Sequence, residues 1–232
     1  MQIYILGDNH GKYNELLKIL EKFDLKDCYI IHVGDGGEGF ANYKSFDLYY
    51  ELNKFFSNRN IQYLSIRGNH SDPEFFKGNF KFSNFELLED YTLREIEGLK
   101  FFFVGGAISI DRKTRQEGIN WWRGEEFNLI PEKTQKCDIL ITHSSPTWNG
   151  PITKVSIRIW EIDDETLWQD CREERQQISK LIELCRPVRH FCGHFHHVFK
   201  AEHEGCRSRI CAELELYELN PYGLTGGGIY NR

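Results

Sequence analysis

The sequence lacks several features that identify large classes of protein. Its 232 residues contain no run of about 20 apolar residues, the length that a membrane-spanning helix needs. No basic segment precedes the first apolar run, at residues 3–6, so we expect no signal peptide. Acidic residues outnumber basic ones, and the net charge of −6 argues against an extended nucleic-acid-binding surface. We therefore expect no membrane partner and no extended nucleic-acid surface, although a local basic pocket is compatible with this charge.

The cysteines form no C-x-x-C motif, which is a common sign of a structural zinc site. Cys206 and Cys211 lie near each other in the sequence, but no second pair of ligands accompanies them. Small buried thiols are the commoner case. The total of seven cysteines is odd, and without an export signal it predicts reduced thiols and a cytoplasmic location.

Neither the composition nor the length is unusual. Apolar residues make up 40% of the chain and charged residues 28%, which are ordinary values for a folded protein. A chain of 232 residues is long enough to bury one sizeable core. We therefore predict a single domain over residues 1–232, with one local insertion.

Three apolar runs, at residues 3–6, 29–33 and 61–66, predict strands that each end at a polar loop containing glycine. Apolar residues at helical spacing follow the first two runs, over residues 13–23 and 46–55. Successive units of strand, ligand-bearing loop and helix favour a largely parallel sheet. The site of such a sheet lies at the carboxyl ends of its strands.

The remainder of the chain favours a second sheet. Glu97-Gly98 is a turn signal that predicts a hairpin between strands at residues 87–95 and 100–104. Gly226-Gly227-Gly228 is expected to be a loose tail. Further runs that predict strands lie at residues 139–141, 191–192, 198–201 and 209–219.

Five short polar segments follow one another along the chain, each beside a glycine or just beyond an apolar run. Loops in such places are where a rigid sheet can present ligands. The side chains concerned are carboxylates, imidazoles and an amide, which are groups that bind metal ions. The segments are Gly7-Asp8-Asn9-His10-Gly11, Gly34-Asp35-Gly36, Gly68-Asn69-His70, Thr142-His143 and Gly193-His194-Phe195-His196.

The spacing within these segments predicts how they bind metal. Asp8 and His10 are two positions apart, and such residues project to the same side of an extended backbone. The same spacing relates His194 and His196. Each pair is therefore able to hold one metal ion, while Asp35 has two carboxylate oxygens with which to bridge to a second ion.

Two further side chains, Asn69 and His143, complete the predicted set of ligands. Mixed imidazole and carboxylate ligands suit Mn, Fe or Zn better than Ca or Mg. Two divalent cations carry four positive charges and the two carboxylates return two negative ones, so the site attracts a phosphate. Two such ions, roughly 3.5 to 4 Å apart, lower the pKa of a bridging water and clamp both sides of an in-line displacement at phosphorus.

The remaining histidine of the third segment has a different expected role. His70 follows Asn69 directly, and neighbours on an extended segment point apart, so we leave it outside the coordination shell. It is then available as a general acid that protonates the leaving oxygen while a metal-bridging hydroxide attacks phosphorus. The residues alone therefore predict a metal-dependent phosphoesterase.

The ordered set D-x-H, G-D, G-N-H, H and G-H-x-H resembles the calcineurin-like metallophosphoesterases, and the match runs from residue 7 to residue 196. Any one of these motifs is weak, whereas five in this order are specific. The resemblance implies an α/β fold in which a β-sandwich of two sheets is flanked by helices, an αββα arrangement. It also assigns one metal ion to Asp8, His10, Asp35 and His196, and the other to Asp35, Asn69, His143 and His194.

The second motif departs from that of the phosphoprotein phosphatases in this family, which reads G-D-x-x-D-R-G. Glu38 stands where their acidic residue orients the catalytic histidine, but Gly39 stands where their arginine holds phosphate. Ser71 replaces the acidic residue that often follows G-N-H. Asp72 beside it is either a second orienting residue or a turn residue. The resemblance therefore does not extend to the phosphoprotein phosphatases in particular.

Arginines are the leading candidates for phosphate binding, because a guanidinium matches two phosphate oxygens at once. Arg67 directly precedes the third motif, and Arg112 and Arg115 lie in the loop after residues 100–104. Trp148, close behind His143, is either a wall of the substrate pocket or a core residue. Asn9 of the first motif completes the predicted substrate-binding residues.

About fifty residues between His143 and His194 contain no predicted ligand. Acidic residues at 163 and 164, an apolar stripe and Pro187 predict a helix within this segment. We regard about residues 146–187 as an insertion that covers the active site.

The sequence predicts an enzyme but leaves its substrate open. A phosphomonoesterase acting on a phosphorylated small molecule, a nucleotide or a phosphoprotein is preferred. One alternative is a phosphodiesterase acting on nucleotides or cyclic nucleotides, and another is a non-catalytic metal-binding scaffold with the same fold. Because every predicted ligand and His70 are present, we favour the enzyme over the scaffold.

Overall fold

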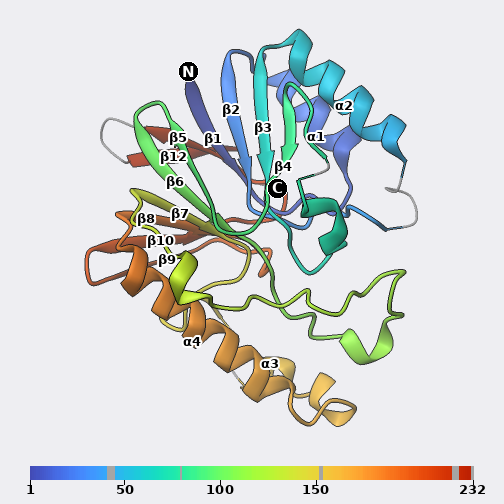
Figure 1. Ribbon diagram of the computed structural model, residues 1–232, viewed down its shortest axis with the longest axis vertical. Coiled ribbons are helices and arrows are strands. Elements are labelled where there is room, and N and C mark those ends of the chain that lie inside the picture. The colour runs from blue at the N-terminus through green and yellow to red at the C-terminus, as the bar shows by residue number, and fades with distance from the viewer. Residues whose placement is uncertain (41–44, 79, 152–153, 221–224, 231–232) are drawn as a thin grey trace.

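The computed structural model describes residues 1–40, 45–78, 80–151, 154–220 and 225–230. Two mixed sheets of six strands each pack face to face, and helices cover their outer faces (Figure 1). This arrangement is the predicted two-sheet sandwich flanked by helices, and the fold class is confirmed.

The first sheet has the strand order β12-β11-β1-β2-β3-β4. Strands β1 to β4 pair in parallel, and β11 and β12 are antiparallel additions beside β1. Parallel pairing brings the carboxyl ends of β1, β2 and β3 to one edge, where the first three motifs follow. The strands are β1 (Gln2–Leu6), β2 (Cys28–His32), β3 (Ile61–Ser65), β4 (Phe85–Leu87), β11 (Leu216–Asn220) and β12 (Thr225–Tyr230).

The second sheet has the strand order β5-β6-β7-β8-β10-β9. Its central strands β6, β7, β8 and β10 are parallel, and the antiparallel β5 and β9 form its edges. The predicted hairpin joins β5 to β6 through Glu97 and Gly98, both at positive φ, as a tight two-residue turn requires. The strands are β5 (Thr92–Ile96), β6 (Leu99–Val104), β7 (Ile139–Thr142), β8 (Arg189–Cys192), β9 (Phe199–His203) and β10 (Cys206–Ile210).

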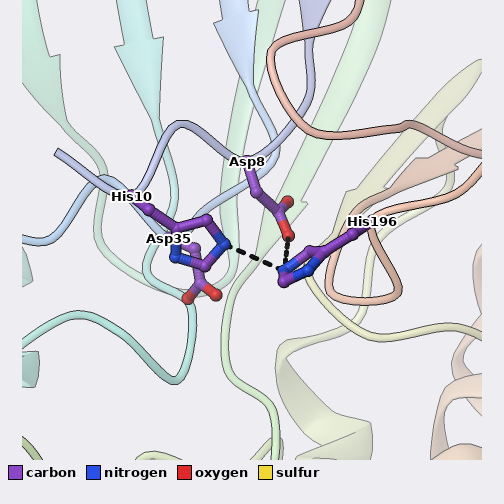
Figure 2. Close-up of side chains that lie close together, drawn as sticks. All are labelled: Asp8, His10, Asp35 and His196. Carbon is purple, nitrogen blue, oxygen red and sulfur yellow. Dashed lines mark hydrogen bonds and ion pairs between the residues drawn. The ribbon is translucent and has the colours of Figure 1, made fainter. Parts of the chain in front are cut away.

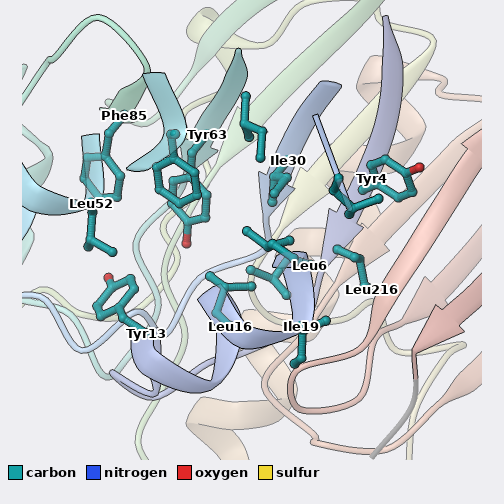
Figure 3. Close-up of a cluster of buried hydrophobic side chains, with 14 of the residues drawn as sticks. Tyr4, Leu6, Tyr13, Leu16, Ile19, Ile30, Leu52, Tyr63, Phe85 and Leu216 are labelled. Atoms are coloured by element: carbon teal, nitrogen blue, oxygen red, sulfur yellow. The ribbon is translucent and has the colours of Figure 1, made fainter. Parts of the chain in front are cut away.

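Two helices cover the outer face of the first sheet. Helix α1 (Tyr13–Lys22) packs its apolar stripe, including Leu16, against Leu6 and Ile30 of the sheet (Figure 3). Helix α2 (Phe46–Asn58) begins at Ser45, whose hydroxyl accepts a hydrogen bond from the backbone N–H of Asp47. Both helices occupy the places that their apolar spacing predicts.

A second apolar layer fills the space between the sheets, and a third lies under the long helix α4 (Leu167–Cys185). Alternation along β6 separates these layers, because Phe101 points toward the first sheet while Phe102 meets α4. Shorter helical segments are α3 (Lys154–Ile157) and the 3-10 helices η2 (Pro73–Phe76), η3 (Arg112–Thr114), η4 (Pro131–Lys133) and η5 (Trp160–Ile162).

The structure corrects three of the predicted strand boundaries. The glycine run expected to be a loose tail belongs to β12, which pairs with β11. The single strand predicted over residues 87–95 is instead the end of β4 and the start of β5, in different sheets. The run over residues 209–219 likewise divides between β10 and β11. The last two runs had the right apolar character, but a break between two strands lies inside each of them.

The segment over residues 146–187 has two parts with different surroundings. Helix α4 covers the second sheet and contributes Ile178 and Leu181 to the core. Residues around α3 and η5 instead border the pocket that holds the motif histidines. Across the part of the chain that the structure describes, no helix is both long and apolar enough to cross a membrane.

Candidate metal centre

The predicted ligands converge where the strands of both sheets end. Asp8 and His10 follow β1, Asp35 follows β2 and Asn69 follows β3, while His143, His194 and His196 follow strands β7 and β8 of the other sheet. Four of the side chains form a first cluster, in which one donor atom from each lies within 4.8 Å of all the others: Asp8, His10, Asp35 and His196 (Figure 2).

Within this first cluster the closest approach is between two imidazoles. The Nε2 atoms of His10 and His196 lie 2.9 Å apart, and Nε2 of His196 is 3.4 Å from Oδ2 of Asp8. Ring nitrogens at this distance can both face one cation. Segments almost 190 residues apart in the chain thereby meet at a single point.

A second cluster shares Asp35 with the first. Donor atoms of Asp35, His143 and His194 lie within 4.8 Å of one another. The amide oxygen of Asn69 is 3.2 Å from Nε2 of His143 and 2.8 Å from Nδ1 of His194. The structure therefore brings together both predicted ligand sets, with Asp35 at the position common to them.

The backbone of these loops is not extended, so the two-residue spacing along a strand does not explain why the candidate ligands point to the same place. His10, Asp35, His194 and His196 all have positive φ, between 46° and 69°. Such conformations cost free energy in residues other than glycine and are concentrated at functional sites. Tight turns, rather than the alternation of an extended strand, therefore aim the paired side chains at one place.

Two glycines allow the loops to approach each other. A Cβ atom at Gly68 would overlap Oδ1 of Asp35, and one at Gly193 would overlap Oδ1 of Asp8. Any larger residue would displace a carboxylate of the cluster. The glycines in the third and fifth motifs are therefore explained by the space that the carboxylates occupy.

The charges of the centre are strongly coupled. Burial raises the pKa of Asp8 to about 7, and the nearby carboxylate of Asp35 adds to this effect. Burial also opposes the charge of Asp35, but the surrounding imidazoles of His143, His70 and His10 together outweigh it and hold the pKa of Asp35 well below its usual value. Burial lowers the pKa of three imidazoles, which favours the neutral form that binds metal ions, at His10, His194 and His196.

The surroundings of one buried carboxylate oxygen indicate whether a cation fits this site. Oδ1 of Asp8 is fully buried and has no hydrogen-bond partner among the described residues. A buried carboxylate oxygen without a partner costs free energy unless a cation compensates it. Together with the mixture of imidazole and carboxylate donors, this atom fits a pair of transition-metal ions.

Hydrogen bonds from outside the clusters orient two of the candidate ligands. Nδ1 of His143 is 2.7 Å from the carbonyl oxygen of Val33, which leaves Nε2 to face the centre. The amide nitrogen of Asn69 donates to the hydroxyl of Ser109 at 3.1 Å, so that its oxygen points toward the histidines. Ser109 in turn donates to Glu125 at 2.9 Å. Ser109 and Glu125 were not predicted from the sequence, because no motif marks them.

Removing the Ser109 hydroxyl should weaken the second cluster specifically. In Ser109→Ala the amide of Asn69 loses its anchor, and we expect metal affinity to fall by about 10- to 100-fold. Ser208→Ala is a matched control, because its hydroxyl is equally buried but bonds to His190 and Asn149. Calorimetric titration with Mn²⁺ measures the difference. Equal affinities in the two variants would show that Ser109 does not orient the ligand.

His70 lies beside the clusters but belongs to neither of them. Its ring centroid is 4.8 Å from that of His10, and burial lowers the pKa of His70 to about 4. A guanidinium nitrogen of Arg115 lies 2.9 Å from its Nε2, and Asp111 holds the same arginine through Nε at 2.7 Å. Of the predicted phosphate-binding arginines, Arg115 is the one placed beside the centre.

A pocket of about 380 Å³ opens beside His70 and the candidate ligands. One wall is polar, with Arg115 and Asp111 next to Asp35 and the histidines. Most of the rest of the lining is apolar, and this part, which we call the apolar wall, was not predicted from the sequence. Its residues are Ile110, Pro151, Ile157, Trp160 and Phe195.

The structure places Arg67 and Arg112 differently from the expectation that they bind phosphate. Nε of Arg67 donates to Asp90 at 2.9 Å, and its other nitrogens donate to the carbonyl oxygens of residues 124–126. Arg67 therefore supports the loop that carries Glu125. Arg112 forms ion pairs with Asp164 and Asp170, and so connects η3 to the start of α4. In both cases acidic partners distant in the sequence engage the guanidinium.

The two predicted orienting acids also contact other groups. Glu38 is buried, accepts hydrogen bonds from Ser71 at 2.7 Å and Tyr13 at 3.2 Å, and has its pKa raised by burial to about 7. Asp72 accepts the backbone N–H of Glu74 and caps η2, which is the turn role weighed for it. The described contacts of these two acids do not include the ring of His70.

The last two substrate-binding candidates lie outside the pocket described above. Trp148 packs with its ring 5.3 Å from that of His203, on the side of α4 and β9. Asn9 is fully buried, and its side-chain oxygen accepts the backbone N–H of Gly11 at 3.3 Å. Trp148 therefore packs against the apolar layer under α4 instead of lining this pocket, and Asn9 stabilises the turn that carries His10.

Comparisons with known proteins agree with this geometry. A family model described as calcineurin-like phosphoesterase matches residues 1–198. An archaeal phosphodiesterase of known structure is similar over 99% of both chains, with 15% identity and a TM-score of 0.51. A putative 5′-nucleotidase from Staphylococcus aureus matches 98% of this chain and 52% of its own, with 12% identity and a TM-score of 0.49. At 15% identity the similarity to the archaeal protein concerns the fold alone. No curated protein sequence matches the chain.

Proposed function

The chain belongs to the calcineurin-like phosphoesterase family, and from this premise we propose that it hydrolyses phosphate esters with two divalent metal ions. The observation that carries the proposal is the pair of donor clusters that share Asp35. Asp8, His10, Asp35 and His196 would hold one ion, and Asp35, Asn69, His143 and His194 the other. The donors suit Mn, Fe or Zn.

The protein side chains have separate roles in this reaction. When bound, the two cations supply a nucleophile from water at neutral pH and neutralise charge on the phosphate. His70 stands next to both clusters, and in its protonated form, which a bound phosphate anion favours against the effect of burial, it protonates the oxygen of the leaving group. Arg115, held by Asp111, binds a phosphate oxygen beside that histidine.

The pocket favours a small substrate with an apolar or ring-bearing alcohol. Its volume of about 380 Å³ is typical of sites for small molecules. We keep a phosphomonoester as the first candidate, because two cations and Arg115 together can neutralise a dianionic phosphate. A phosphodiester is the second candidate, since the apolar wall has room for another ester arm and Asp111 disfavours additional negative charge there. The seven buried, free thiols suit a reducing compartment, so the proposal places the enzyme in the cytoplasm.

Hydrolysis of p-nitrophenyl phosphate and bis(p-nitrophenyl) phosphate, with and without a chelator, tests the proposed reaction. We expect at least one of the two esters to be hydrolysed and the activity to disappear when metal is removed. The ratio of the two rates decides between monoester and diester. Activity that survives complete removal of metal would rule out the metal-dependent reaction.

The role of the apolar wall has its own test. In Trp160→Ala we expect KM for an aryl phosphate to rise about five- to tenfold, because an aromatic contact contributes about 1 kcal/mol. KM for glycerol phosphate should change much less. Trp148→Ala is the matched control, because that ring packs on the far side of α4. A uniform change with both esters would show that Trp160 does not contact the leaving group.

A further inference from the structure

A second pocket, remote from the metal centre, lies where β9 and β10 face β11 and β12. Its volume is about 440 Å³. Four basic side chains from the second sheet line it, together with the acidic Glu202 and the ring of Tyr217. The basic residues are Arg189, Lys200, Arg207 and Arg209. Such a concentration of positive charge is notable in a chain whose net charge is −6.

The strand register explains why these side chains converge. Arg207 lies opposite Arg189 in the parallel pair of β10 and β8, and Arg209 lies opposite Lys200 in the antiparallel pair with β9. Residues two apart on a strand share a face, so Arg207 and Arg209 point the same way. That face is turned toward the first sheet, because the guanidinium of Arg209 lies 4.6 Å from the ring of Tyr217.

Aromatic rings hold two of the guanidiniums in place. Arg189 lies 4.9 Å from the ring of Phe191 and donates to the hydroxyl of Tyr217 at 3.1 Å. Arg209 stacks on Tyr217 and pairs with Glu215. Both arginines are only 6% exposed, so the layer between the sheets is cationic here instead of apolar. The rings fix the cations but do not neutralise them.

The charge of this pocket is incompletely compensated within the chain. Nε of Arg209 is buried without a hydrogen-bond partner, and the side chains of Lys200 and Arg207 form no hydrogen bond or ion pair with any described residue. Glu215 compensates the buried charge of Arg209, so the charges left without an opposite partner are those of Lys200 and Arg207, whose side chains line the more exposed part of the pocket. An anion bound between Arg207, Lys200 and Arg209 would supply the opposite charge.

From these contacts we infer that this pocket, which we call the arginine pocket, binds a phosphate-type anion. Guanidinium groups match phosphate oxygens in pairs, which makes this anion the best fit. The faces of Tyr217 and Phe191 are already covered by guanidiniums, so the ligand is recognised through its phosphate and not through a ring. Free phosphate and the phosphate group of a small metabolite share this chemistry.

The arginine pocket is distinct from the metal centre and does not depend on the reaction proposed there. Arg189 is the first residue of β8, whereas His194 follows the other end of that strand. Five residues at about 3.3 Å each separate them by roughly 16 Å. Phosphate can therefore bind at either place without contacting the other.

Calorimetric titration with inorganic phosphate tests the arginine pocket. We use the full chain carrying Asp35→Ala, which removes the shared candidate ligand of the metal centre, and keep the ionic strength constant with sodium chloride. Phosphate should bind this variant, and adding Lys200→Gln and Arg207→Gln should weaken the binding at least tenfold. Adding Lys18→Gln and Arg172→Gln, which change the net charge equally on exposed surfaces, should leave it unchanged.

Two further arms complete the experiment. In one arm glycerol 3-phosphate replaces inorganic phosphate, to show whether the anion is free phosphate or the phosphate group of a small metabolite. If either compound binds and the binding is lost in the Lys200→Gln and Arg207→Gln variant, the inferred anion site is supported. Phosphate should also raise the melting temperature of the Asp35→Ala chain more than chloride does. No phosphate binding to Asp35→Ala, or equal binding with and without Lys200 and Arg207, would overturn the inference. Neither result depends on whether the wild-type chain hydrolyses esters.

Discussion

Replacement of Asp35 by alanine is expected to remove metal from both clusters and to lower ester hydrolysis by about a thousandfold. Asp35 is the one side chain common to the two donor sets, so its loss weakens both ions together. Its Oδ1 also accepts the backbone N–H of His70 at 2.7 Å, so the loop carrying the proposed acid loses an anchor. A loss of about 4 kcal/mol of transition-state stabilisation corresponds to this factor. Metal analysis and kcat of the purified variant measure the two effects.

Asp72→Ala is the control for this experiment. This variant also removes a carboxylate near the third motif, but that carboxylate caps the 3-10 helix η2 and belongs to neither cluster. We expect it to lower stability by about 1 kcal/mol while metal content stays unchanged. If the Asp35→Ala chain kept two metal ions, Asp35 would not be the bridging ligand.

Replacement of His70 by alanine should have nearly as large an effect on turnover but none on metal content. General acid catalysis contributes about 10²- to 10⁴-fold, and His70 lies outside both clusters. The loss should be greater for an alkyl phosphate than for p-nitrophenyl phosphate, since a poor leaving group depends more on protonation. Rates for the two esters, together with metal analysis, test this role.

His203→Ala is the matched control for this variant, because its ring packs against Trp148 on the far side of α4. It should leave both rates unchanged. Loss of metal from His70→Ala would move this histidine into the coordination shell. An equal loss of rate with both esters would show that His70 does not protonate the leaving group.

The candidate ligands could be predicted from the sequence better than their surroundings, because each ligand lies beside an apolar run or a glycine that is visible in the sequence. Asp35 and His143 each lie one residue beyond an apolar run, and parallel pairing brings the ends of such strands to one edge. The clustering therefore follows from topology alone. The positive φ values that aim His10 and His196 leave no mark in the sequence beyond the neighbouring glycines.

Roles that depend on distant partners were not predictable. Arg67 and Arg112 had the residue type that phosphate requires, but Asp90 lies 23 residues from the first and Asp164 lies 52 residues from the second. Pairing at such separations depends on the whole fold. The hydrogen-bond chain from Asn69 through Ser109 to Glu125 was missed for the same reason.

The glycine run near the carboxyl terminus was mispredicted for a different reason. Gly226 and its two successors have no side chains, so they carry none of the alternation from which strands are predicted. Their backbone nevertheless pairs with β11, where Gly227 lies opposite Glu218. A side chain at Gly226 would overlap the carbonyl oxygen of Glu218, which explains the residue type at that position.

Titration of the metal-depleted protein with Mn²⁺, with bound metal and ester hydrolysis measured on the same samples, shows whether the two clusters act together as one dinuclear centre. The two clusters that share Asp35 predict that activity is absent without metal and reaches its maximum when two ions are bound per chain. Full activity with no ion or with one ion would contradict a dinuclear centre. Two bound ions without hydrolysis of any phosphate ester would contradict the enzyme and favour a metal-binding scaffold.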